Sequence, residues 1–165
     1  MKVRRKPKTI RDLLYCLRRK LLEGAMNEPL IHIRKERELR LRRVKNAIRR
    51  AWCRETCYPP TQEIWSEDIP ERGQCAVTAM VMQDYMGGDI LYCSHTNHYW
   101  NRLSDGREVD LTRSQFPSDL KICFDEVADR QRLVNYGSAM IMSRYSLLKH
   151  RVERLLESHK KLNAF

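Results

Sequence analysis

A largely apolar run followed by three short strand-like segments constrains this fold most. The run begins at Cys75 and reads Cys-Ala-Val-Thr-Ala-Met-Val-Met, which by periodicity alone fits a buried strand or a buried helix. It continues to Met86, beyond the usual length of a strand, and Gly87-Gly88 suits a left-handed helix C-cap. We therefore predict a mostly buried helix that starts near Cys75. The strand candidates after it are Asp89–Cys93, Asn97–Leu103 and Arg107–Thr112.

Helical spacing of apolar residues predicts the flanking elements. Gly24 is expected to stop the first helix, and Asn27-Glu28-Pro29 is expected to form a turn before the second. The expected helices are Thr9–Glu23, Arg34–Arg54, a short one around Asp125–Leu133, and Ser138–Leu162. The apolar stripe of the second helix is Leu41, Val44, Ile48, Ala51 and Trp52. The predicted fold class is α+β, with N-terminal basic helices, a helix bearing a cysteine at its start on a small antiparallel sheet, and a C-terminal helix.

The register of the predicted hairpin decides whether His98 and Asp110 share a face of the sheet. A two-residue loop, Asp105-Gly106, would put them on opposite faces. A three-residue loop, Ser104-Asp105-Gly106, with Gly106 left-handed, puts them on the same face and sets Arg102 opposite Glu108 as a cross-strand pair. The second register also gathers the apolar side chains on the other face, so we prefer it.

The charge of the chain is concentrated at its N-terminus. Residues 1–50 hold 18 Lys and Arg against 5 Asp and Glu, whereas the whole chain carries a net charge of +11. We predict a basic helical extension, residues 1–45, ahead of an α+β domain, residues 46–165. Its basic surface fits nucleic acid, and also an anionic membrane surface or an acidic protein. The candidate nucleic-acid contacts are Arg34, Lys35, Arg37, Arg40, Arg42, Arg43, Lys45, Arg49 and Arg50.

The cysteines point to a reducing compartment. Six of them fall at irregular intervals, and the basic N-terminus lacks an apolar segment long enough for a signal peptide or a membrane span. We expect free thiols, a cytoplasmic location, no transmembrane segment and no cofactor. A zinc site formed by Cys53, Cys57, Cys93 and His95 is a weaker alternative. It is weaker because no pair among these residues has the two-residue spacing that is usual for zinc ligands.

Cys75 is the candidate nucleophile because the start of a helix lowers the pKa of a thiol. His98 is the candidate base and Asp110 the group that orients it, whereas His95 falls in a predicted loop and is the poorer base. The side-chain amide of Gln74 is a candidate oxyanion donor. Trp100 is expected on the same face of the sheet as His98, as a wall of the cleft.

The same residues resemble the YunG-like bacterial proteins. The matching strings run from Gly73-Gln74-Cys75-Ala76-Val77-Thr78-Ala79 through Gly87-Gly88-Asp89-Ile90-Leu91 and His98-Tyr99-Trp100-Asn101-Arg102-Leu103 to Asp105-Gly106, Asp110-Leu111-Thr112 and Gln115-Phe116. The resemblance covers about residues 47–157 and leaves out the basic segment. It implies a papain/transglutaminase-like core in which Cys75, His98 and Asp110 form a triad.

These features lead to two functional hypotheses. The first is a cysteine hydrolase or acyl transferase that acts on an amide, ester or thioester bond of an unknown substrate, either a small molecule or a protein. The alternative is a non-catalytic inhibitor or adaptor that binds nucleic acid or a nucleoprotein through the basic helices. The two are compatible, since the extension could deliver a catalytic domain to its target.

Overall fold

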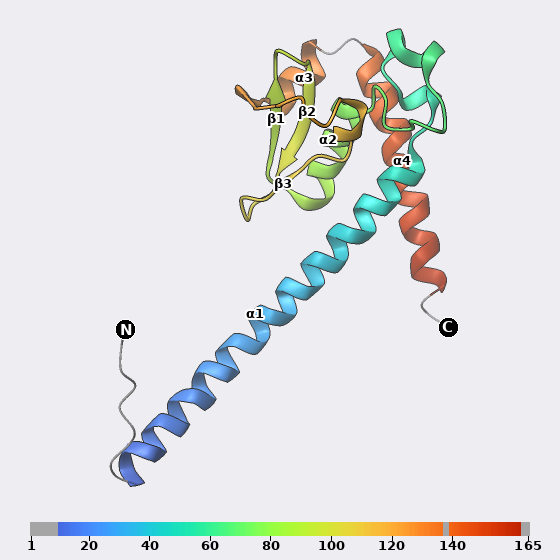
Figure 1. The fold of residues 1–165 in the computed structure, drawn as a ribbon. Coiled ribbons are helices and arrows are strands. Elements are labelled where there is room, and N and C mark those ends of the chain that lie inside the picture. Colours follow the sequence, from blue (N-terminus) through green and yellow to red (C-terminus); the bar gives the residue numbers. More distant parts are fainter. Residues whose placement is uncertain (1–9, 137–138, 163–165) are drawn as a thin grey trace. The chain divides into compact units, whose positions relative to one another are not determined.

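The computed structural model describes residues 10–136 and 139–162, which contain four α-helices and four strands besides three short 3-10 turns (Figure 1). Contacts divide the chain into two units, Met1–Arg40 and Leu41–Phe165. The expected helix starts Thr9 and Ser138 lie outside the described residues. In the described part of the chain, no helix is long and apolar enough to cross a bilayer.

Helix α1 spans Ile10–Ala51 without interruption. The predicted stop at Gly24 and the predicted turn at Asn27-Glu28-Pro29 are therefore wrong. One glycine and one proline weaken a helix locally, but the flanking Leu, Arg, Lys and Glu residues are strong helix formers. Their summed propensity outweighs the two local penalties.

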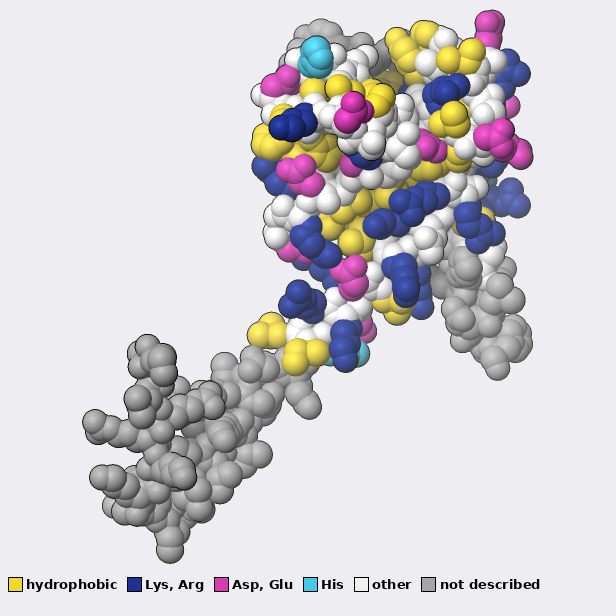
Figure 2. Space-filling model, viewed as in Figure 1, with side chains coloured by type: hydrophobic (Ala, Val, Ile, Leu, Met, Phe, Trp, Pro, Cys, Tyr) yellow, Lys and Arg dark blue, Asp and Glu magenta, His cyan; other side chains and the backbone are white. Residues whose placement is uncertain are grey.

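In the first unit, side chains are described for residues 30–40, and all of them except half-buried Arg37 are exposed. Figure 2 shows basic and hydrophobic side chains together on the surface of this segment. Leu30 and Ile33 are 64% and 60% exposed. This part of α1 therefore contributes little to the core that the structure describes.

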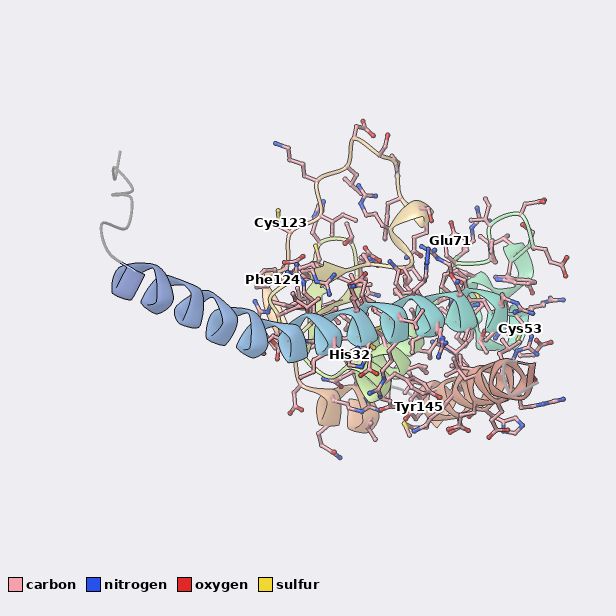
Figure 3. The ribbon with its side chains drawn as sticks, turned by 90° about the horizontal axis from the view of Figure 1, so that it is seen from below. His32, Cys53, Glu71, Cys123, Phe124 and Tyr145 are labelled. Atoms are coloured by element: carbon pink, nitrogen blue, oxygen red, sulfur yellow. The ribbon has the colours of Figure 1, made fainter. Side chains whose placement is uncertain are left out.

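In the second unit, the predicted stripe of α1 is buried, from Leu41 at 3% exposed to Ile48 and Ala51 at 0%. The helix ends at Ala51 rather than at Arg54, and two 3-10 turns follow, Arg54–Thr56 and Pro59–Ile64. Cys53 lies just beyond the end of α1 (Figure 3). Trp52 is also buried, and its Nε1 donates a hydrogen bond to Thr78 Oγ1 at 2.9 Å.

Four antiparallel strands form a sheet with the order β3-β2-β1-β4. The strands are β1 (Asp89–Cys93), β2 (His98–Arg102), β3 (Glu108–Val109) and β4 (Glu126–Ala128). The short helix expected around Asp125–Leu133 is instead β4 followed by α3 (Arg130–Tyr136). Pairing of β4 along the edge of β1 is a tertiary contact that local sequence does not predict.

The predicted hairpin register is confirmed. Asn101 pairs with Val109 and Arg102 with Glu108, and Gly106 has a φ of 83°. The expected contact between Arg102 and Glu108 is replaced, however. Arg102 forms an ion pair with Asp89 at 2.8 Å, and the Glu108 carboxylate accepts a hydrogen bond from Trp100 Nε1 at 2.8 Å. Asp89, on the adjacent strand β1, is the carboxylate that pairs with Arg102.

Helix α2 spans Cys75–Met86, as predicted, and packs on one face of the sheet, while α4 (Ala139–Leu162) packs against α2. The main core between these layers includes five side chains that are fully buried: Ile48, Met80, Met82, Ile90 and Leu148. A smaller cluster of Leu91, Cys93 and Trp100 covers the other face. The fold class is therefore α+β with a small antiparallel sheet.

Candidate active site

Cys75 is the first residue of α2, at the position that the sequence predicted. The first N–H groups of a helix have no partner within the helix, so this end carries a partial positive charge. Gly73, with a φ of 68°, leads into the helix. A Cβ on Gly73 would come within 2.7 Å of Cys57 Sγ. A glycine is therefore needed for the chain to pass this close to the Cys57 thiol.

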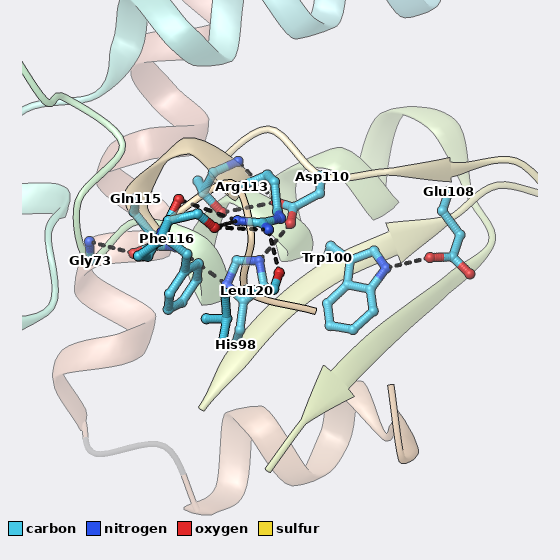
Figure 4. A network of polar contacts seen from close by, with 11 residues as sticks. Gly73, His98, Trp100, Glu108, Asp110, Arg113, Gln115, Phe116 and Leu120 are labelled. Carbon is cyan, nitrogen blue, oxygen red and sulfur yellow. Dashed lines mark hydrogen bonds and ion pairs between the residues drawn. The ribbon is translucent and has the colours of Figure 1, made fainter. Parts of the chain in front are cut away.

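His98 and Asp110 form the central contact of the candidate site (Figure 4). Their Nε2 and Oδ2 atoms lie 2.7 Å apart, and His98 is completely buried. The Asp110 carboxylate is held in turn by the Thr112 N–H at 3.0 Å and the Thr112 hydroxyl at 3.2 Å. His98 and Asp110 are therefore in contact, as the hairpin register predicted, although Asp110 lies just beyond the end of β3.

Two aromatic rings fix the plane of the His98 imidazole. Trp100 stacks on it with a centroid separation of 5.5 Å, and Phe116 approaches edge-on at 4.8 Å. Trp100 was expected to form a wall of the cleft. It is instead 5% exposed and supports His98 from within the protein.

The charge of His98 is controlled by its neighbours. Burial alone lowers the pKa of an imidazole, but hydrogen bonds and charges from Asp110 and Cys75 outweigh that effect and raise the pKa of His98 to about 9. Since Nε2 faces Asp110, Nδ1 is the nitrogen that Cys75 can contact, and the amide of Gln115 lies beside the same nitrogen. His98 thus links the thiol of Cys75 to a carboxylate.

Gln115 also contacts His98. Its Oε1 accepts a hydrogen bond from the Gly73 N–H at 3.3 Å, and its Nε2 lies 3.3 Å from His98 Nδ1 (Figure 4). The loop that carries Gln115 is held by Arg113, whose guanidinium donates to the backbone carbonyl of Leu120 at 2.6 Å and to those of Phe116 and Pro117. Arg113 therefore fixes the positions of Gln115 and Phe116.

Gln74 is fully buried, and its Nε2 donates to the backbone carbonyl of Cys53 at 2.9 Å. It does not line the pocket, whereas Gln115 does. The predicted role of Gln74 as an oxyanion donor stays a prediction. Of the two amides, that of Gln115 has the more direct access to the space around Cys75.

A pocket of about 600 Å³ opens beside Cys75, a volume typical of small-molecule sites. Cys75, Gly73 and Gln115 line it together with Tyr58 and Arg144. His98 and Asp110 do not line the pocket, so they lie behind the thiol. Cys75 is therefore the member of the predicted group that a ligand in this pocket would reach first.

The other candidate residues lie elsewhere. His95 is exposed in the turn between β1 and β2. Among the described residues, no group of three or more His, Cys, Asp or Glu side chains could hold a metal ion, and the five described cysteines are free thiols. Burial raises the pKa of the Cys57 thiol. Seven of the nine predicted basic contacts are exposed, and Arg37 and Lys45 are half-buried.

The sequence pattern assigned no role to Gln115 or to Arg144, although Gln115 belongs to one of the strings that resemble the YunG-like proteins. Arg144 lies three residues after Ile141 and four before Leu148, both of which are buried. A charged residue on the apolar stripe of a helix is a signal that could have identified it.

Comparison with known proteins identifies the family. The model of the family described as "YunG protein" matches residues 40–157. The chain is 32% identical over 80 residues to the "Uncharacterized protein YunG" of Bacillus subtilis (strain 168), a match that covers 47% of this chain and 64% of that relative. No solved structure matches the chain. Since the family model spans most of the chain, including α2 and the whole sheet, the protein belongs to the YunG family.

Proposed function

We propose that this protein is a cysteine hydrolase or acyl transferase with a papain/transglutaminase-like arrangement of Cys75, His98 and Asp110. One observation carries the proposal: a fully buried histidine contacts a carboxylate at 2.7 Å and a thiol at the start of a helix. Nucleophile, base and orienting group in this order are what acyl transfer requires. The adjoining pocket offers room for a small acyl group or the end of a peptide.

In the proposed reaction, His98 Nδ1 takes the proton of the Cys75 thiol, and the thiolate attacks the carbonyl carbon of an amide, ester or thioester. A new C–S bond forms, and the leaving group departs with the proton from His98. Water, or another nucleophile in acyl transfer, then attacks the thioester after giving its proton to His98, and the Cys75 thiolate leaves. The Asp110 carboxylate stabilises the imidazolium that forms in each half of the reaction.

Oxyanion stabilisation requires donors on the pocket side of Cys75. The backbone N–H of Cys75 is one such donor, because it lies in the first turn of α2. We assign the second to the Gln115 amide, whose orientation is set by its contact with the Gly73 N–H. Gln74 would support the site indirectly by tying the start of α2 to Cys53.

The rate of Cys75 alkylation by iodoacetamide as a function of pH tests the proposal. Site-resolved mass spectrometry should show that Cys75 reacts at pH 6 far faster than an ordinary thiol, which is almost fully protonated at that pH. In His98→Ala the selectivity should disappear. At pH 6 only about 0.3% of an ordinary thiol is ionised, so the rate of Cys75 alkylation at pH 6 should be on the order of 100-fold lower in His98→Ala.

Two matched controls accompany the experiment. His95→Ala removes an exposed histidine and should leave the Cys75 rate unchanged, and exposed Cys123 reports ordinary thiol reactivity in the same molecule. Cys123 lies on the loop before β4 (Figure 3). A Cys75 rate that tracks that of Cys123 at every pH, or one that His98→Ala does not change, would contradict the proposal.

The exposed basic side chains of α1 support a second candidate function, binding to nucleic acid. Substitution of Arg34, Lys35 and Arg40 by Gln in the full chain should weaken binding to a labelled RNA or DNA oligonucleotide. The loss should be larger at 50 mM than at 200 mM salt, because fewer counterions are released. Binding that is absent in the unsubstituted protein, or unaffected by the substitutions, would remove this candidate.

A further inference from the structure

Arg144 is a buried cation in the wall of the pocket. It lies on α4, is 7% exposed and lines the same pocket as Cys75. Its Nε atom is buried without a hydrogen-bond partner. A buried charge is costly unless it is paired, so an arginine in this state points to a missing anion.

No carboxylate among the described residues forms an ion pair with Arg144. Asp129 also lines the pocket, but its carboxylate accepts a hydrogen bond from the Gln131 N–H at 2.9 Å. The Tyr58 ring lies 5.8 Å from the guanidinium carbon, a contact that offsets only part of the cost of burial. Arg72, the other arginine of the pocket, differs because its Nη1 donates to the carbonyl of Ile64 at 2.8 Å.

Arg144 is also close to the candidate nucleophile. The charges of Cys75, Cys57 and Tyr58 act on the guanidinium, although burial is the larger effect and lowers the pKa of Arg144. An arginine remains protonated even so, because a guanidinium does not lose its proton in proteins. A planar guanidinium with free donors suits a carboxylate, which can accept two parallel hydrogen bonds.

We infer that Arg144 binds a carboxylate of the substrate, so that the pocket takes amides, esters or thioesters with a carboxylate close to the reacting carbonyl, as in an N-acylated amino acid. This inference rests on the proposed function, because it names the substrate class of the same site. Arg144 would hold the carboxylate while the neighbouring acyl carbon faces Cys75. Neutral analogues would bind poorly, since they would leave the guanidinium buried and unpaired.

Two alkylating reagents that differ in charge test the inference in the full-length protein. Iodoacetate carries a carboxylate and iodoacetamide does not, so the ratio of their rates at Cys75 removes the effect of the thiolate fraction. Relative to exposed Cys123, we expect this ratio to favour iodoacetate about tenfold at Cys75. Arg144→Gln should bring the ratio back to that of Cys123, and Arg144→Lys should retain part of the preference.

Arg154→Gln is the matched control, because Arg154 is an exposed arginine of the same helix. A second measurement needs no variant and decides the question if the Arg144 variants do not fold. N-acetylglycine at millimolar concentration should protect Cys75 from iodoacetamide, whereas N-acetylglycinamide should not. Equal protection by both, protection by inorganic phosphate alone, or a rate ratio independent of Arg144 would overturn the inference.

The same data separate this inference from the proposed function. Iodoacetamide alone reports whether Cys75 is an activated thiol that depends on His98. If that activation is present but charge selectivity is absent, the substrate assignment fails and the proposed function stands. If Cys75 shows no activation with iodoacetamide, the proposed function fails whatever the charge preference.

Discussion

The two ends of α2 carry polar groups of contrasting kinds. Near its C-terminal end, Asp84 forms ion pairs with Arg130 at 2.7 Å and Lys149 at 3.1 Å, and accepts a hydrogen bond from the Tyr145 hydroxyl at 2.5 Å. We call these four residues the Asp84 cluster. At the other end lie Cys75, His98 and Asp110, the Cys75 site, beside an arginine without an anion.

Helix α4 contributes to both regions through adjacent residues. Arg144 lines the pocket, and Tyr145, labelled in Figure 3, donates to Asp84 and accepts hydrogen bonds from Arg130 and Lys149. In the Asp84 cluster each charge has a partner, so its chemistry is complete within the fold. The Cys75 site has an unpaired cation and an open pocket. This contrast distinguishes a structural network from a site arranged for a ligand.

The largest expected effect is the pH dependence of stability that His98 confers. Its pKa is raised from 6.5 to about 9 on folding, so the folded state binds the proton more tightly. The resulting stabilisation is fully present below pH 6.5 and is lost as the pH rises to about 9. It amounts to on the order of 3 kcal/mol. Urea denaturation across this range measures it.

His98→Gln should remove most of that pH dependence, whereas His95→Gln should leave it intact. The raised pKa of Cys57 acts in the same direction but only above its ordinary value of 9.0, outside the window. A free energy of unfolding that stays flat between pH 6.5 and 9 in the unsubstituted protein would contradict the assigned coupling.

Asp110→Asn should affect the Cys75 site chiefly through charge. The amide oxygen can still accept a hydrogen bond from His98, but the negative charge that stabilises the imidazolium is lost. We expect the rate of Cys75 alkylation at pH 6 to fall about tenfold, because the imidazolium of His98 loses about 1.4 kcal/mol of stabilisation. Exposed Asp119 provides the control, since Asp119→Asn should not change the rate.

Asp84→Asn should lower stability and leave Cys75 alkylation nearly unchanged. It removes both ion pairs of the Asp84 cluster and should lower the free energy of unfolding by about 1–2 kcal/mol. Cys75 alkylation should stay within about twofold, because the cluster lies at the far end of α2. For comparison, Asp105→Asn breaks a pair with Arg107 on an exposed turn and should cost less than about 0.5 kcal/mol. A large loss of Cys75 reactivity in Asp84→Asn would show that the two regions are coupled.

Of the substitutions at the Cys75 site, Trp100→Phe is expected to have the smallest effect. The substitution removes the Nε1 hydrogen bond to Glu108 and keeps an aromatic ring against His98. It should lower the free energy of unfolding by about 1 kcal/mol and leave Cys75 alkylation nearly unchanged. A strong loss of reactivity would mean that the indole itself, rather than aromatic packing, holds His98 in position.

Much of the second unit could be predicted because its signals are local. The apolar run and its glycine pair predicted α2 with its start at Cys75, and hairpin parity predicted the contact between His98 and Asp110. The turn at Pro29 was predicted wrongly, since local breaker signals do not measure the summed propensity around them. The edge strand β4 was missed, because its partner β1 lies more than thirty residues earlier in the sequence.

The sequence by itself determined the period of each element, the alternation of side chains along the strands and the concentration of positive charge before residue 50. Only the tertiary structure decided which polar groups meet. In the structure Arg102 forms an ion pair with Asp89 rather than with Glu108, and the Gln74 amide donates a hydrogen bond to the Cys53 carbonyl. Arg144 lines the pocket of Cys75 without a carboxylate partner. The physical reason is that helical and strand periods are properties of the local backbone. The pairing of charges and hydrogen-bonding groups depends instead on which distant segments of the chain pack together when apolar surface is buried.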